Sequence, residues 1–71
     1  MLYSGDFFIA ELVHKLIMIE RKNGESLAVT TDAQGRIIAV MNEYGMDAIE
    51  DLFPEEIAAI RHIATESKEV R

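Results

Sequence analysis

The residues best suited to chemistry in this sequence are its two histidines and the carboxylates near them. Glu11 and His14 have the Glu-x-x-His spacing that di-iron sites in helical bundles take from one helix, because residues i and i+3 project together. Such a site needs a second copy, but His62 has Ala59 three positions before it. We therefore expect Glu11 and His14 to be solvent-exposed helix residues, and we expect no metal site.

Two other polar patterns have structural explanations. His62 and Glu66 are four residues apart, which is the spacing of a surface pair on a helix. Asp32-Ala33-Gln34-Gly35 lacks the alternating oxygen ligands and the closing glutamate of a calcium loop. The glycines form no phosphate-cradling cluster, and no nucleophile stands near a base in the sequence. The sequence therefore predicts a protein without enzymatic activity, cofactor or metal.

The strongest chemical feature is a run of carboxylates in the second half of the chain. It contains six acids and no base: Glu43, Asp47, Glu50, Asp51, Glu55 and Glu56. We call these six residues the acidic ridge. Such a ridge can imitate a phosphate backbone and occupy the basic cleft of a nucleic-acid-binding protein. The alternatives are acids that stabilise helix N-termini and solubilise a small domain, or a charged rim around an ordinary interface.

Composition limits the class of protein. The chain has 71 residues, which suits one domain over residues 1–71, and its apolar fraction of 49% predicts a folded chain. The net charge of −6, from 13 acids and 7 bases, disfavours direct binding of nucleic acid or an anionic membrane. Without a basic secretory start or a span of about 18 apolar residues, a cytoplasmic protein is expected. Since cysteine is absent and so small a core is weakly stable, self-association is also expected.

The clearest local structure is a β-hairpin within Leu27 to Met41. Its two runs are rich in β-branched residues, and Asp32-Ala33-Gln34-Gly35 lies between them. Asp32 suits the start of a type I turn, where its carboxylate accepts a backbone N–H two residues on, and Gly35 suits a position with positive φ.

Two strand registers are open for this hairpin. In the first, Thr31 pairs with Arg36 and Leu27 faces Val40, which gathers the larger apolar residues on one face. In the second, Gly35 forms a bulge, Asp32 pairs with Arg36, and the apolar set is divided between the faces. The hydrophobic pattern favours the first register.

Before the hairpin, the sequence favours a helix between Asp6 and Asn23. This segment contains no Gly or Pro, its apolar residues fall on one broad stripe, and Gly24 suits a helix end. Glu20 falls within the apolar stripe. The alternative is a strand from Leu16 to Lys22 that pairs with Glu25 to Thr31, because Asn23-Gly24 is a strong hairpin-turn signal.

After the hairpin, the sequence predicts two helices. Asn42 suits the cap of the first, and Pro54 suits the first turn of the second. The second helix has an apolar stripe formed by Ile57, Ile60, Ile63 and Ala64. A strand-helix-helix arrangement from Arg36 to His62 also occurs in ribbon-type DNA binders, but too few basic or polar residues are available to read a groove.

These elements predict an α+β domain with an N-terminal helix, an antiparallel β-hairpin and two C-terminal helices. The alternative fold is a three-stranded β-meander followed by two helices. The function that we expect is a small, acidic, non-enzymatic protein-interaction or regulatory module, which forms a homodimer. The alternative is an inhibitor of a nucleic-acid-binding protein, acting through the acidic ridge. The residues expected at an oligomer interface are Phe7, Ile37, Ala39 and Met41.

Overall fold

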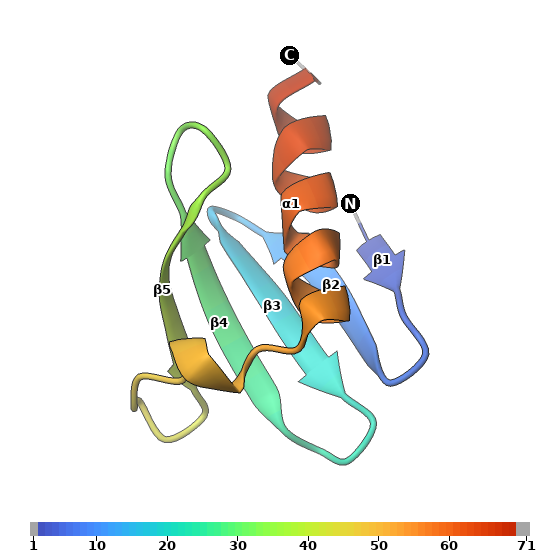
Figure 1. Ribbon diagram of the computed structural model, residues 1–71, viewed down its shortest axis with the longest axis vertical. Coiled ribbons are helices and arrows are strands. Elements are labelled where there is room, and N and C mark those ends of the chain that lie inside the picture. The colour runs from blue at the N-terminus through green and yellow to red at the C-terminus, as the bar shows by residue number, and fades with distance from the viewer. Residues whose placement is uncertain (1, 70–71) are drawn as a thin grey trace.

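A computed structural model describes residues 2–69 of the chain. Figure 1 shows an antiparallel sheet with a C-terminal helix lying across one of its faces. Each strand pairs with its neighbours in the sequence, so the strand order is β1-β2-β3-β4-β5. The elements are β1 (Leu2–Ser4), β2 (Phe8–Val13), β3 (Leu16–Arg21), β4 (Ser26–Thr31), β5 (Ile37–Asn42), the 3-10 helix η1 (Ile49–Asp51) and α1 (Pro54–Glu69).

The expected N-terminal helix is wrong, because its residues form β2 and β3. A two-residue turn at His14 and Lys15 separates these strands, and Val13 pairs with Leu16. Burial alternates along β3, where Ile17 and Ile19 are buried whereas Leu16 and Glu20 are exposed. This period of two is that of a strand with one covered face, and it explains why Glu20 did not fit a helical stripe.

The alternative meander is also wrong as a fold, since residues 2–69 form five strands before α1. Its pairing of the Leu16 to Lys22 segment with the following strand does occur: Ile19 lies opposite Leu27 in the β3–β4 ladder. Two elements were missed, namely the strand formed by residues 8–13 and the short edge strand β1, whose Tyr3 lies opposite Ala10.

The first of the two expected C-terminal helices is wrong as well. The chain after β5 makes a further hairpin turn, in which the side-chain oxygen of Asn42 accepts the backbone N–H groups of Tyr44 and Met46. Asn42 therefore caps a turn and not a helix. The chain then pairs back on β5, where the Ala48 N–H donates to the Val40 carbonyl at 2.9 Å, before the single turn of η1.

The second expected helix is present as α1, and it begins at Pro54 as expected. Its apolar stripe packs on the sheet: Ile60 and Ile63 are completely buried, and Ala64 is 6% exposed. α1 contacts β1, β2 and β3, and together with β4 and β5 these strands enclose one cluster of buried residues. The core therefore lies between α1 and one face of the sheet.

The β4–β5 turn is confirmed, but the favoured register is wrong. The Asp32 carboxylate accepts the Gln34 N–H at 2.9 Å, and Gly35 has a φ of 82°. The Asp32 N–H donates to the Arg36 carbonyl, as the second register proposed. Further along, however, the register shifts between Thr30 and Thr31, and Val29 then lies opposite Val40.

The physical reason for this register is the extra residue that the shift introduces into β5. With that residue, Val40 is buried at 2% exposure, and Ile37, three positions before it, also packs against the core. Ile38 is left 59% exposed. A β5 without a bulge would keep a single alternation along its length, so it would place Ile37 and Val40 on opposite faces of the sheet.

Candidate functional site

The face of the sheet opposite α1 is the first candidate surface. Within residues 2–69 no helix covers it, and the strand registers place alternate residues of all five strands on it. We call this surface the open face. It consists of Leu2, Ser4, Ile9, Glu11, Val13, Leu16, Met18, Glu20, Ser26, Ala28, Thr30, Ala39 and Met41.

The open face is largely apolar. Leu2 is 59% exposed, Met41 50% and Ile9 45%, and Val13 and Leu16 are also exposed. Antiparallel sheets that have one solvated face usually carry polar residues there. Because the apolar residues are contiguous over several strands, the open face has the character of an interaction surface.

A hollow of about 250 Å³ lies in the open face where β1, β2 and β3 meet. It is lined by Leu2, Ile9, Glu11, Met18 and Glu20, and we call it the open-face hollow. Ile9 lies opposite Glu20, and Glu11 lies opposite Met18. The two carboxylates therefore occupy one diagonal of a four-residue square, and two apolar side chains occupy the other.

Neither carboxylate of the open-face hollow has an ion-pair partner within residues 2–69. The single basic residue in the described strands is Arg21, and its side chain points to the face that α1 covers. The open-face hollow thus combines an apolar lining with two uncompensated negative charges.

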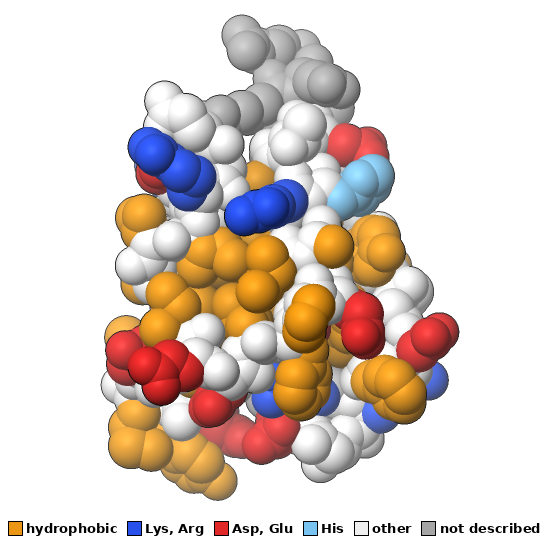
Figure 2. Space-filling model, viewed as in Figure 1, with side chains coloured by type: hydrophobic (Ala, Val, Ile, Leu, Met, Phe, Trp, Pro, Cys, Tyr) orange, Lys and Arg blue, Asp and Glu red, His pale blue; other side chains and the backbone are white. Residues whose placement is uncertain are grey.

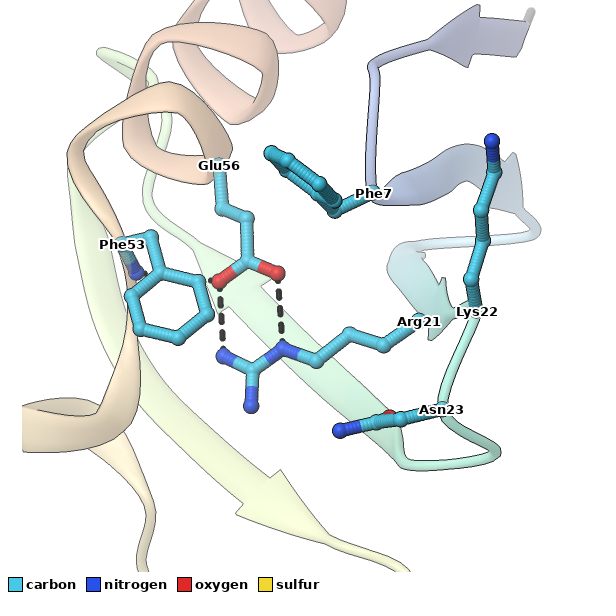
Figure 3. A pocket seen from close by; sticks show the side chains of 6 residues that line it. All are labelled: Phe7, Arg21, Lys22, Asn23, Phe53 and Glu56. Carbon is cyan, nitrogen blue, oxygen red and sulfur yellow. Dashed lines mark hydrogen bonds and ion pairs between the residues drawn. The ribbon is translucent and has the colours of Figure 1, made fainter.

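A larger cleft of about 430 Å³ lies beside the start of α1. Figure 3 shows Phe7 and Phe53 on either side of an arginine–glutamate pair, with Lys22 and Asn23 at the rim. We call it the aromatic cleft, and its lining residues are Phe7, Arg21, Lys22, Asn23, Phe53 and Glu56. Phe7 is 67% exposed and Phe53 is 53% exposed.

Arg21 lies at the centre of the aromatic cleft, where each of its three guanidinium nitrogens donates a hydrogen bond. Its Nε and Nη2 donate to the two oxygens of Glu56 at 2.8 and 2.7 Å, and Nη2 also donates to the Asp51 carbonyl. Nη1 donates to Glu25 at 3.0 Å, and the guanidinium lies 4.6 Å from the centre of the Phe53 ring. The hydrogen bonds to Glu56 are the largest influence that raises the pKa of Arg21 above its usual range.

Glu56 is buried at 1% exposure, and each of its oxygens is hydrogen-bonded. Besides Arg21, it accepts the backbone N–H of Phe53, as the third helical residue does in one half of a capping box. Burial raises the pKa of Glu56, but the hydrogen bonds from Arg21 and Phe53 and the positive charge of Arg21 together lower it by more. The carboxylate is therefore a structural anion that joins β3 to α1.

The acidic ridge is not one helical surface. Glu43 lies in the turn after β5, Asp47 before η1, Glu50 and Asp51 in η1, and Glu55 in the first turn of α1. These five are exposed, and Figure 2 shows acidic side chains around the lower end of the molecule in this view. Glu56 does not belong with them, because its carboxylate is buried against Arg21.

The four residues expected at an oligomer interface are not brought together. Ala39 and Met41 share the open face, opposite Thr30 and Ala28 respectively. Ile37 is half-buried against the core, and Phe7 lines the aromatic cleft.

The histidines do not form a metal site in the described part of the chain. Glu11 is in the middle of β2 and His14 is in the following turn, so the helical geometry of the Glu-x-x-His motif does not apply. His62 pairs with Glu66 on α1, as expected from their spacing, and its ring contacts Tyr3 edge to face. Residues 2–69 contain no group of three or more possible metal-ligating side chains, and none of their helices is long and apolar enough to span a membrane.

The sequence interpretation missed most of the open-face hollow. Leu2, Ile9 and Met18 were not singled out, and Glu11 was placed on a helix. No local sequence signal identifies them, because the residues of β2 alternate in burial but not in polarity. Comparison with models of protein families, with curated proteins and with solved structures finds no match to this chain.

Proposed function

We propose that this protein is a protein-interaction module that binds a partner protein through the open face. The observation that supports this proposal is the set of exposed apolar residues on β1, β2 and β5, namely Leu2, Ile9 and Met41. α1 already covers the other face, so the open face is the face of the sheet that no helix covers within residues 2–69. Covering such a face removes apolar area from water, which is the main driving force of association.

A homodimer through the open face is the second candidate. Two such faces could pack at the spacing of about 10 Å that is typical of sheet-on-sheet contacts. The apolar residues favour it, but Glu11 and Glu20 oppose it, because self-association would remove four carboxylates from water without a base from the strands to compensate them. A partner of different sequence suits the charge of the open face better.

Site-specific photo-crosslinking in the source cell tests the proposal. We expect Met41→benzoylphenylalanine, on the open face, to crosslink to another protein. The matched control is Tyr44→benzoylphenylalanine, because Tyr44 is 77% exposed in the turn after β5. Crosslinks to a second copy of the chain would support the homodimer, whereas equal crosslinking from both positions, or none from Met41, would contradict the proposal.

A further inference from the structure

The open-face hollow has the shape and the charge to hold one basic side chain. Its apolar lining comes from three strands, through Leu2, Ile9 and Met18. Lysine and arginine carry long aliphatic stems that pack on apolar surface while the charged group stays at a polar rim. The hollow offers both parts of that environment.

The positions of the two carboxylates suit a single cation between them. Glu11 lies opposite Met18, and Glu20 is two residues further along the same strand. Diagonal neighbours of this kind in an antiparallel pair are about 7–8 Å apart. One ammonium or guanidinium group that enters between them can donate to both carboxylates, and such charge-assisted hydrogen bonds are stronger than neutral ones.

Glu11 and Glu20 differ from the acidic residues of the protein that form ion pairs with arginine. Glu25, Asp32 and Glu56 each bind an arginine of the same chain. Glu11 and Glu20 have no ion-pair partner within residues 2–69, although they stand among apolar side chains. Their charge is therefore available for a base from outside.

The area of the open face indicates the kind of partner that can supply this base. Strands lie about 4.8 Å apart and rise about 3.3 Å per residue, so five strands of up to six residues cover roughly 400 Å² in plan. Even with the relief of side chains, this falls short of the roughly 800 Å² per partner in a standard protein–protein interface. A short basic and apolar segment fits this area better than a second folded domain.

We infer that the open-face hollow receives a lysine or arginine side chain from a short, apolar segment of a different protein. The inference rests on the proposed function and adds the chemistry of the partner to it. The net charge of −6 supports the same choice, because a negative field draws a basic segment towards the protein.

Selection from a random peptide display library on the folded, full-length protein tests the inference. The double variant Glu11→Gln, Glu20→Gln serves as the counter-target. We expect the selected peptides to share a lysine or arginine with apolar neighbours. Synthetic copies of them should bind the double variant about tenfold more weakly, since each lost charge-assisted contact is a strong one. Norleucine in place of the shared base should weaken binding similarly.

The matched control is Glu43→Gln, Glu55→Gln, which removes the same two charges from exposed positions away from the open face. We expect peptide affinity to change by less than about twofold, because general steering depends only weakly on two distant charges. All four substituted positions are exposed, and the amide spectrum of each variant verifies its fold. An equal loss of affinity in both double variants would overturn the inference.

A second pair, Ile9→Thr with Met41→Thr, separates the inference from the proposed function. If Ile9→Thr, Met41→Thr loses binding and Glu11→Gln, Glu20→Gln does not, the inferred role of the basic side chain is overturned. The open face would then remain the binding surface. Binding that is insensitive to both pairs would overturn the inference and the proposed function. Failure to enrich any peptide over the Glu11→Gln, Glu20→Gln counter-target would overturn the inference, and crosslinking from Met41 would still decide the proposed function.

Discussion

Arg21 and Glu56 are 35 positions apart in the sequence and form a bidentate ion pair, with Nε to Oε2 at 2.8 Å and Nη2 to Oε1 at 2.7 Å. Arg21 is the last residue of β3, and Glu56 is in the first turn of α1. The Arg21 side chain is 9% exposed and that of Glu56 is 1% exposed. The pair therefore fixes the start of the helix on the sheet, and it does so with charges that are largely removed from water.

Removing Arg21 alone should destabilise the protein strongly. We expect Arg21→Met to lower the free energy of unfolding by about 3 kcal/mol, because Glu56 would keep a buried charge without its partner. Urea unfolding followed by circular dichroism measures this loss. The control is Arg36→Met, whose side chain is 76% exposed and pairs with Asp32 at the surface. Its loss should be about 0–1 kcal/mol.

The double variant Arg21→Met, Glu56→Gln should recover part of this loss. A glutamine at position 56 keeps an oxygen for the Phe53 N–H, and it removes the buried charge. We therefore expect the double variant to be more stable than Arg21→Met alone. Losses that simply add across the double-mutant cycle would show that the two residues are not coupled.

Glu56 should also make stability depend on pH in the acid range. Burial raises its pKa, but the hydrogen bonds from Arg21 and Phe53 and the positive charge of Arg21 together outweigh burial and leave the folded-state pKa below the ordinary value of 4.5. The ionised folded state is thus favoured above pH 4.5, and this stability is lost as the pH falls through the lower folded-state pKa. We expect Glu56→Gln to flatten the fall in the free energy of unfolding between pH 5 and pH 3. An unchanged slope would contradict this assignment.

The pKa of Asp32 is also lowered in the folded state, so Glu56→Gln should not abolish the fall in the free energy of unfolding at acid pH. The backbone N–H of Arg36 is the largest influence that lowers the pKa of Asp32, and the Arg36 side chain and the Gln34 N–H lower it further. If the free energy of unfolding of Glu56→Gln did not change with pH between pH 5 and pH 3, the Asp32 carboxylate would contribute nothing to the pH dependence of stability.

The two-residue turn between β2 and β3 contains a residue in a strained conformation. His14 has a φ of 58°, which is the left-handed region that residues with a Cβ rarely adopt. We expect His14→Gly to stabilise the protein by about 0.5–1 kcal/mol, because glycine adopts this conformation without a steric cost. Thermal unfolding measures the change. His62→Gly is the contrasting control, since a glycine within α1 should destabilise.

Gly35 and Gly45 permit a matched comparison of backbone strain with helix packing. Their φ angles are 82° and 80°, so alanine is equally strained at both positions. A Cβ at Gly35 would lie 3.2 Å from the Cβ of Ala64 on α1, whereas one at Gly45 would meet nothing within 4 Å. We expect Gly45→Ala to cost about 1 kcal/mol and Gly35→Ala distinctly more. Equal losses in the free energy of unfolding, measured with urea, would show that α1 moves near Ala64 to accommodate the new methyl group.

The sequence predicted one turn, one helix start and the existence of strands around the central hairpin, because each has a local chemical signal. Asp32 and Gly35 identify their turn through side-chain capping and positive φ, and Pro54 identifies the start of α1. The N-terminal helix was predicted wrongly because residues 8–21 are nearly all apolar or long-chained, so a period of two and a period of 3.6 both fit. Only the buried position of Ile17 and Ile19 against α1 decides between them.

The open-face hollow could not be predicted from the sequence, for a related reason. Glu11 and Glu20 are nine positions apart, and they become diagonal neighbours only through the β2–β3 register. The Arg21–Glu56 pair depends in the same way on how α1 lies across the sheet. Contacts of this kind are set by tertiary packing, whereas turns and caps are set by adjacent residues.

One local signal was present three times: it was interpreted as a hairpin turn at Asp32, as an alternative hairpin turn at Asn23-Gly24, and as a helix start at Asn42. The turns that begin at Arg21, Asp32 and Asn42 each have glycine in the fourth position, with a positive φ. In each, the glycine N–H donates to the carbonyl of the first residue, and the first residue's N–H donates to the carbonyl of the fifth. The repeat at intervals of ten or eleven residues is the sequence signature of the hairpins from β3 onward.

A substitution at Asn42 tests this interpretation of the turn after β5. Its side-chain oxygen accepts the N–H groups of Tyr44 at 2.9 Å and Met46 at 3.0 Å, as that of Asp32 does for Gln34 and Arg36. We expect Asn42→Ala to cost about 1 kcal/mol, because two backbone donors lose their acceptor. Asn42→Asp should keep most of this stability, since its carboxylate accepts the same bonds. Amide exchange should accelerate at Tyr44 and Met46 in Asn42→Ala alone, and faster exchange throughout residues 43–53 instead would indicate that Asn42 caps a helix there.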